Sequence, residues 1–120
     1  MRCDKIEAEK LLRYIAELAQ QKKAENIKLL DIREFSNIAD YFFLCSGNSD
    51  RQVTTIAENI IENLKKLHIR PQGLEGLKQG RWIVIDYIDI VVHIFYEQVR
   101  EFYEIDELWS LGVELKVSEK

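Results

Sequence analysis

Apolar residues follow the spacing of an α-helix in two long segments of the chain. In residues 4–23 and again in residues 53–67 they recur every three or four positions, which places them on one side of a helix. Each segment has a capping-box pattern near its start, a polar cap followed three residues later by Glu or Gln: Asp4 with Glu7, and Ser49 with Gln52. The pattern therefore predicts two amphipathic helices that each bury one face.

Five shorter segments are rich in β-branched and aromatic residues and have the pattern of strands. They cover residues 26–32, 41–46, 69–75, 82–86 and 89–95. The nearly continuous apolar run at 41–46 predicts a central strand. Pro71 cannot donate a hydrogen bond to a neighbouring strand, so its segment is expected at an edge of the sheet. The last two segments are separated by so little chain that they must pair as an antiparallel hairpin.

The pattern of the residues after Phe95 predicts smaller helical elements. A short amphipathic helix is expected after Phe95, with Val99, Phe102 and Tyr103 as its apolar positions, and a further helical turn at 106–109 that ends at Gly112. Residues 113–120 are polar enough to fray. We found no internal repeat and no linker, so residues 1–120 are expected to form a single α/β domain, a mixed β-sheet with flanking helices.

Composition narrows the class of protein. The 120 residues are 47% hydrophobic and 10% aromatic, which excludes a disordered or membrane-spanning chain. A net charge of −4 disfavours a protein whose main task is to bind nucleic acid. No zinc-binding set can be assembled from the cysteines and histidines, and two cysteines make no disulfide framework. The charged N-terminus lacks the apolar core of a signal peptide, so a location in the reducing cytoplasm is expected. The sequence indicates no cofactor.

Two sets of residues could support chemistry, and each has a simpler structural explanation. Residues 46–49, Ser-Gly-Asn-Ser, lie between a strand and a helix where a phosphate could bind, but a capping serine explains them without a ligand. Asp86 and Asp89 could hold magnesium for nucleotidyl transfer, yet both lie at the tip of the predicted hairpin, where aspartate commonly stabilises turns. His93 is expected to be partly buried and hydrogen-bonded rather than a general base, because the sequence places no Ser or Cys nucleophile beside it. Cys45 is expected to be a small core residue.

The hairpin also predicts a surface for a partner. Strand alternation places Trp82, Val84 and Asp86 on one face, and the aliphatic Ile83 and Ile85 on the other. Either face could be the buried one. Because the two isoleucines already supply a core-facing side, we expect Trp82 to be exposed, as aromatic anchors of protein interfaces often are.

Two blocks of sequence resemble the ribosomal silencing factor family, also called the Iojap family. The first contains Asp-Tyr-Phe at 40–42, Ser-Gly-x-Ser at 46–49 and Gln-Val at 52–53. The second contains Glu-Gly at 75–76, Trp-Ile-Val-Ile-Asp-Tyr at 82–87, Asp89, Val-His-Ile-Phe at 92–95, Arg100, Tyr103 and Leu-Trp at 108–109. Both blocks keep the order and spacing of the family pattern, and the resemblance extends from about residue 11 to residue 109.

The resemblance implies a translation regulator rather than an enzyme. Members of the family bind the large ribosomal subunit through the protein numbered fourteen in the universal nomenclature. They thereby block joining of the small subunit and lower translation when nutrients are scarce. Organellar relatives act in ribosome assembly. The resemblance further implies a fold like a nucleotidyltransferase core without its active site, little direct contact with nucleic acid, and a homodimer when the protein is free.

Carried over by position, the resemblance assigns a contact surface. The residues expected in or beside it are Trp82, Asp86, Tyr87, Asp89 and His93, with Arg100 and Tyr103 as support. Residues 46–52 are expected to be structural.

Two departures from the family pattern bear on this surface. Ile88 stands where the family usually has glycine, so we expect a turn without positive φ there. Glu107 replaces a residue that is often basic, which is expected to alter docking of the C-terminal turn. Three alternatives stay open: a ribosome-assembly factor, a magnesium-dependent nucleotidyltransferase that uses the two hairpin aspartates, and an RNA-binding maturation factor.

Overall fold

The computed structural model describes residues 5–34, 37, 39–104, 107 and 113–115. Both long helices and the hairpin lie where the sequence predicts them. The elements are, in chain order, α1 (Lys5–Gln21), β1 (Glu25–Asp31), β2 (Tyr41–Gly47), α2 (Asp50–Lys66), β3 (Gly73–Glu75), β4 (Trp82–Asp86), β5 (Ile90–Tyr96), α3 (Glu97–Phe102) and β6 (Val113–Leu115).

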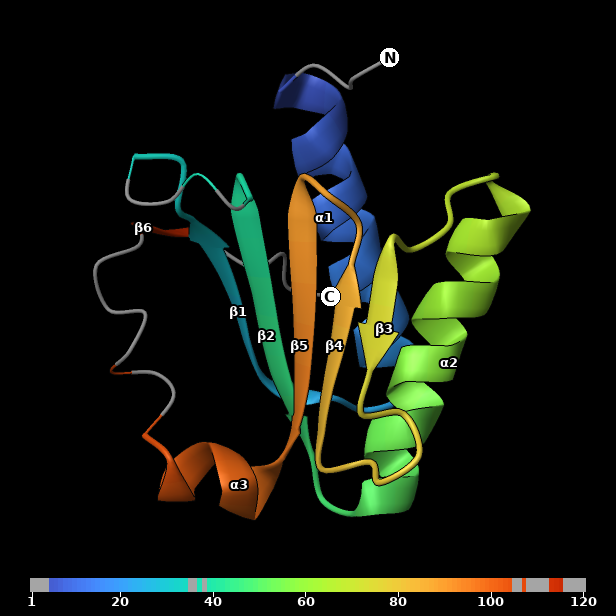
Figure 1. Cartoon of the computed structure of the whole chain (residues 1–120), viewed down its shortest axis with the longest axis vertical. Coiled ribbons are helices and arrows are strands. Elements are labelled where there is room, and N and C mark those ends of the chain that lie inside the picture. The colour runs from blue at the N-terminus through green and yellow to red at the C-terminus, as the bar shows by residue number, and fades with distance from the viewer. Residues whose placement is uncertain (1–4, 35–36, 38, 105–106, 108–112, 116–120) are drawn as a thin grey trace.

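The described strands form one six-stranded sheet in the order β3-β4-β5-β2-β1-β6. β2 and β5 pair in parallel, and every other neighbouring pair is antiparallel, which confirms the predicted mixed sheet. β2 is central and β3 is an edge strand, as the apolar run and Pro71 indicate. α1 and α2 lie together on one side of the sheet (Figure 1). We call this side the covered face and the opposite side the outer face.

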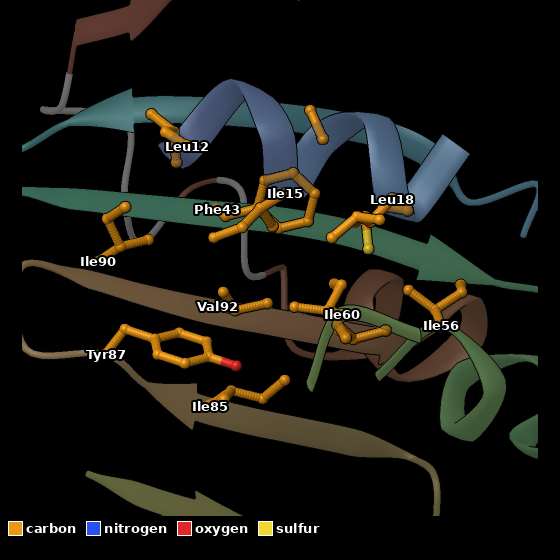
Figure 2. Close-up of a cluster of buried hydrophobic side chains, with 14 of the residues drawn as sticks. Leu12, Ile15, Leu18, Phe43, Ile56, Ile60, Ile85, Tyr87, Ile90 and Val92 are labelled. Atoms are coloured by element: carbon orange, nitrogen blue, oxygen red, sulfur yellow. The ribbon is translucent and has the colours of Figure 1, made fainter. Parts of the chain in front are cut away.

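The covered face holds the main core. Apolar side chains from both helices pack against alternate residues of β2, β4 and β5, among them Leu12, Ile60, Phe43, Ile85 and Val92 (Figure 2). All five are fully buried. Ile83 and Ile85 both face this core, as predicted. A smaller core lies on the outer face, and its members are Leu30, Ile32, Ala39, Phe42, Leu44, Val91 and Phe95.

The start of α2 differs in one detail from the predicted capping box. Ser49 is the N-cap, and its hydroxyl accepts from the Gln52 N–H at 3.1 Å, as expected. The Gln52 side chain, however, accepts from the Asn48 N–H and donates to the carbonyls of Lys22 and Lys23. The return bond therefore goes to the residue before the N-cap, and the amide nitrogen of the same side chain connects α2 to the residues that follow α1. The capping box predicted at Asp4 lies outside the described residues.

Of the three apolar positions predicted for the short helix α3, Val99 packs against the smaller core as expected, and the other two do not. Phe102 is 77% exposed and Tyr103 is also exposed, whereas Arg100 is buried. Hydrogen bonds explain the difference: Arg100 donates through one guanidinium nitrogen to the Asn26 carbonyl at 2.7 Å and to the Ser46 hydroxyl at 2.9 Å. A buried guanidinium that has polar partners can replace the apolar contacts of an ordinary amphipathic helix.

The expectation that residues 113–120 fray is wrong for the first three of them. Val113–Leu115 forms β6 and pairs with β1 in an antiparallel register, Leu29 opposite Leu115. Pairing with an otherwise open strand edge gives these residues backbone hydrogen bonds that the sequence pattern does not reveal. The predicted helical turn at 106–109 and its stop at Gly112 lie outside the described residues, apart from Glu107.

Candidate functional site

The outer face of the β4–β5 hairpin carries the side chains that the sequence singled out. Trp82 lies opposite Phe95 and Val84 lies opposite His93, so these four side chains share one face. Trp82 is 38% exposed, which confirms the prediction that it is not packed under a helix. The same strand thus buries its isoleucines under the helices and presents a tryptophan on the other side.

Aromatic rings surround Trp82. We define the aromatic cluster as Phe42, Trp82, His93, Phe95 and Tyr103. The Trp82 ring centroid lies 5.1 Å from that of Phe95 and 6.4 Å from that of Tyr103. The His93 ring is nearly parallel to Phe95 and lies 4.9 Å from the Phe42 ring. Rings packed at these distances lose little entropy on binding, because their rotation is already restricted.

A hydrogen bond joins the two polar members of the aromatic cluster. The Trp82 indole N–H donates to Nδ1 of His93 at 3.2 Å. His93 is 8% exposed, and burial lowers its pKa from the ordinary 6.5 to about 4, so the ring is neutral at physiological pH. The structure therefore confirms the predicted hydrogen bond of His93 and buries the residue more fully than expected.

Phe102 extends the exposed surface and was assigned by the sequence to the buried side of a helix. Its ring meets Tyr103 edge-on at a centroid distance of 4.9 Å. Both rings are more exposed than Trp82. Their exposure follows from the side of α3 that Arg100 fixes against the sheet, a long-range contact for which the sequence gives no signal. Trp82, Tyr103 and Phe102 together make an exposed aromatic patch.

Arg100 holds α3, and with it this patch, against the sheet. Its bonds to Asn26 and Ser46 reach two different strand ends, β1 and β2. The Arg100 guanidinium is therefore buried beneath the exposed surface.

The tip of the hairpin has a left-handed backbone conformation at Ile88 that differs from the predicted turn. Ile88 has φ +77°, so the expectation of a turn without positive φ is wrong. The Asp89 N–H donates to the Tyr87 carbonyl at 2.9 Å, which closes a tight three-residue turn, and the Asp86 carboxylate accepts from the Ile88 N–H at 2.8 Å. A β-branched residue is strained at such a φ, and Ile88 is also largely exposed.

The backbone under Trp82 is fixed by a glycine. Gly76 has φ +83°, and a Cβ added there would lie 2.1 Å from the Trp82 carbonyl oxygen. Only glycine allows this close approach, so the turn after β3 can pack against the backbone of Trp82, the first residue of β4. The Glu-Gly pair in the second sequence block therefore shapes the position of Trp82.

Acidic groups lie on the same side of the sheet as the aromatic patch. Glu75 lies opposite Val84 on the outer face, and Asp86 continues the same face of β4. Near α3, the residues that line a cleft of about 480 Å³ include four glutamates, Glu97, Glu101, Glu104 and Glu107, and two cations, Lys28 and Arg100. Such a surface attracts a basic partner and repels the phosphates of nucleic acid.

Tyr87 is placed away from this surface. Its side chain belongs to the covered-face core beside Ile85 (Figure 2), and burial raises its pKa to about 12. Tyr87 was expected in or beside the contact surface, but strand alternation directs its side chain to the face opposite Trp82. Cys45 is also in this core, and burial raises the pKa of its thiol to about 12, as expected for an inert cysteine.

The alternative chemistries find little support in the part of the chain that is described. No group of three or more His, Cys, Asp or Glu side chains there is arranged to hold a metal ion. Asp86 serves the turn, and the Asp89 carbonyl accepts from the Asp40 and Tyr41 N–H groups. At the start of α2, the N–H groups of Asn48, Gln52 and Val53 have protein acceptors. None of the described helices is long and apolar enough to span a membrane.

A family model, a curated protein and a solved structure are each similar to this chain over most of its length. Residues 5–120 match the sequence model of the family described as "Ribosomal silencing factor during starvation". The "Ribosomal silencing factor RsfS" of Bacillus subtilis is 38% identical over 100 residues, which cover 83% of this chain and 85% of that protein. A crystal structure from Chromobacterium violaceum, 27% identical, superposes with a TM-score of 0.82 over 93% of this chain and 92% of that one.

A more distant similarity concerns ribosome assembly. The mouse protein named "Mitochondrial assembly of ribosomal large subunit protein 1" is 27% identical over 100 residues. The match covers 81% of this chain but only 44% of the mouse protein.

Proposed function

Because the chain belongs to the ribosomal silencing factor family, we propose that it binds the large ribosomal subunit through the protein numbered fourteen in the universal nomenclature. Bound there, it blocks joining of the small subunit and lowers translation when nutrients are scarce. The observation that supports this proposal is the exposed aromatic patch of Trp82, Tyr103 and Phe102 with carboxylates beside it.

The composition of the patch favours a protein partner. Trp and Tyr bury a large area at a low cost in side-chain entropy, so they often supply most of the binding energy of an interface. Here Trp82 is already held by His93 and Phe95, and Tyr103 lies beside it. We expect Trp82 to be the central contact, with Tyr103 and Phe102 beside it.

The charge of the surface favours basic protein over RNA. Glu75 and Asp86 lie on the same face of the sheet as Trp82, the chain has a net charge of −4, and the nearby cleft has four glutamates against two cations. Complementary charge speeds association and sets the orientation of the two partners. We include Asp86 and Asp89 among the contacts, and we place His93 and Arg100 beneath them as supports.

Inhibition by this mechanism needs no chemical step. A body measuring 36 × 33 × 30 Å that is bound at the face where the subunits meet would exclude the other subunit by its volume alone. We therefore propose that the protein is a cytoplasmic regulator without enzymatic activity. We also propose that it is a homodimer when free, which light scattering would test: a monomeric mass at micromolar concentration would contradict it.

The first experiment is co-sedimentation with purified large subunits. We expect Trp82→Ala to weaken binding by roughly 30-fold or more, since truncation of an aromatic hot spot typically costs about 2–4 kcal/mol. Leu67→Ala is the matched control, because Leu67 is an exposed apolar residue at the end of α2, on the other side of the sheet. Wild-type binding by the Trp82 variant would remove the patch from the site.

A charge variant tests the acidic part of the surface. Asp86→Asn keeps an oxygen that can accept from the Ile88 N–H but removes the charge, so we expect slower association and a weaker dependence on salt. Glu58→Gln removes one charge from the exposed side of α2 and is the control. An equal effect of both variants would indicate that net charge, rather than this surface, governs association.

The name of the mouse relative favours a second candidate function, in assembly of the large subunit. The two functions predict different partners. A silencing factor binds mature large subunits and prevents their association with small ones, whereas an assembly factor binds precursor particles. Affinity capture from lysate followed by sequencing of the ribosomal RNA ends would distinguish mature from immature particles.

A further inference from the structure

His93 lies directly beneath the exposed indole of Trp82 and is fixed from several sides. Its Nδ1 accepts the indole N–H at 3.2 Å. Its ring is stacked on Phe95, with an angle of 8° between the planes and 6.0 Å between the centroids, and it contacts the Phe42 ring at 4.9 Å. The imidazole therefore cannot turn without repacking the aromatic cluster.

The hydrogen bond from Trp82 determines the protonation state of this imidazole. A neutral histidine accepts at one ring nitrogen and carries its proton on the other, so Nδ1 as acceptor requires the proton on Nε2. Nε2 is buried and has no hydrogen-bond partner among the described residues. A buried donor without an acceptor costs free energy, so this arrangement does not give the greatest stability.

We propose that His93 is the positioning residue of the docking surface: its neutral, Nε2-protonated imidazole holds the Trp82 indole in the orientation in which the partner meets it. This inference rests on the proposed function and explains why a polar side chain occupies an otherwise apolar site. Without the acceptor, the half-exposed indole can sample other rotamers. The partner must then order it during binding, which reduces affinity without removing any direct contact.

Two substitutions of His93 distinguish the effect of its hydrogen-bond acceptor from the effect of its aromatic ring. His93→Asn keeps an acceptor atom at the position of Nδ1, whereas His93→Phe keeps an aromatic ring and removes the acceptor. The readout in the free protein is the ¹⁵N–¹H resonance of the Trp82 indole and its rate of hydrogen exchange. The chain has two tryptophans, and a Trp109→Phe background leaves Trp82 as the only indole.

We expect His93→Phe to shift the indole resonance, to speed its hydrogen exchange, and to weaken binding to large subunits roughly tenfold, the effect of losing one hydrogen bond. His93→Asn should restore most of both properties. A merely structural role predicts equal losses in the two variants, and that outcome would overturn the inference. Normal binding by the His93→Phe variant would also overturn it.

The two proposals can fail separately. If Trp82→Ala binds normally, the docking surface itself is wrong. If Trp82→Ala loses binding while both His93 variants keep it, only the positioning role fails. Should either variant not fold, the imidazole ¹⁵N shifts of the wild-type protein still decide, because the inference requires the proton on Nε2, and a proton on Nδ1 would contradict it.

Discussion

The two faces of the β4–β5 hairpin show how one short strand can serve both stability and recognition. On the covered face, Ile83 and Ile85 are fully buried under α1 and α2 in an almost entirely apolar core. On the outer face, Trp82 and Asp86 reach solvent. The buried polar or charged residues of the described chain, Ser46, His93 and Arg100, all belong to this side. Stability therefore depends mainly on one face, and binding is expected to depend on the other.

Two phenylalanine-to-alanine substitutions, one on each side of the sheet, give the strongest test of this division between stability and binding. Phe43→Ala opens a cavity in the covered-face core and should lower the free energy of unfolding by about 3–5 kcal/mol. Phe102→Ala, on the exposed patch, should change it by less than about 0.5 kcal/mol and should weaken ribosome binding instead. Urea denaturation and co-sedimentation measure the two effects. Similar losses of stability in both variants would contradict the division.

The outer face should also make stability depend on pH. Burial lowers the pKa of His93 from 6.5 to about 4, so the unfolded chain takes up a proton before the folded one does. The contribution of neutral His93 to the free energy of unfolding is fully present above pH 6.5. It falls by about 3 kcal/mol in all as the pH drops towards 4.

The matched variant for this pH effect is His93→Phe, which removes the titrating group. Urea denaturation at pH 7, 6 and 5 should give a steeper decline for the wild type than for the variant. Parallel curves would show that other groups, such as the carboxylates, account for the whole dependence.

Two glycines near β3 test how the outer face is positioned. Gly76→Ala places a Cβ against the Trp82 carbonyl at a positive φ, so it should destabilise the fold by about 2 kcal/mol and displace Trp82. Gly73→Ala is the control, because the nearest atom to its Cβ would be 3.8 Å away, an ordinary contact. If both variants unfold at the same urea concentration, the close approach at Gly76 does not matter.

The smallest effect is expected at the hairpin tip. Ile88→Gly relieves the strain of a β-branched residue at φ +77° and should raise the free energy of unfolding by about 1 kcal/mol. Leu67 is also exposed but has φ −93°, so Leu67→Gly should lower stability slightly. Thermal unfolding compares the two, and a loss of stability at Ile88 would mean that its side chain makes contacts worth more than the strain.

Some of the candidate site could be predicted from the sequence, because it depends on local rules. Alternation along β4 separated Trp82 from Ile83, and the aliphatic side chains of the opposite face favoured an exposed Trp82. The apolar neighbours of His93 indicated its burial. Phe102 could not be placed in this way. Its exposure depends on Arg100, whose partners Asn26 and Ser46 are more than fifty residues away in the chain.

Residue order alone was enough to predict the α/β class, the two long helices, the hairpin and the family, because hydrophobic periodicity and local motifs are properties of neighbouring residues. The folded chain, and not the local pattern, placed Arg100 rather than Phe102 against the sheet and paired Val113–Leu115 with β1. It also joined the Trp82 indole to His93. Each of these features depends on contacts between segments that only the folded chain brings together.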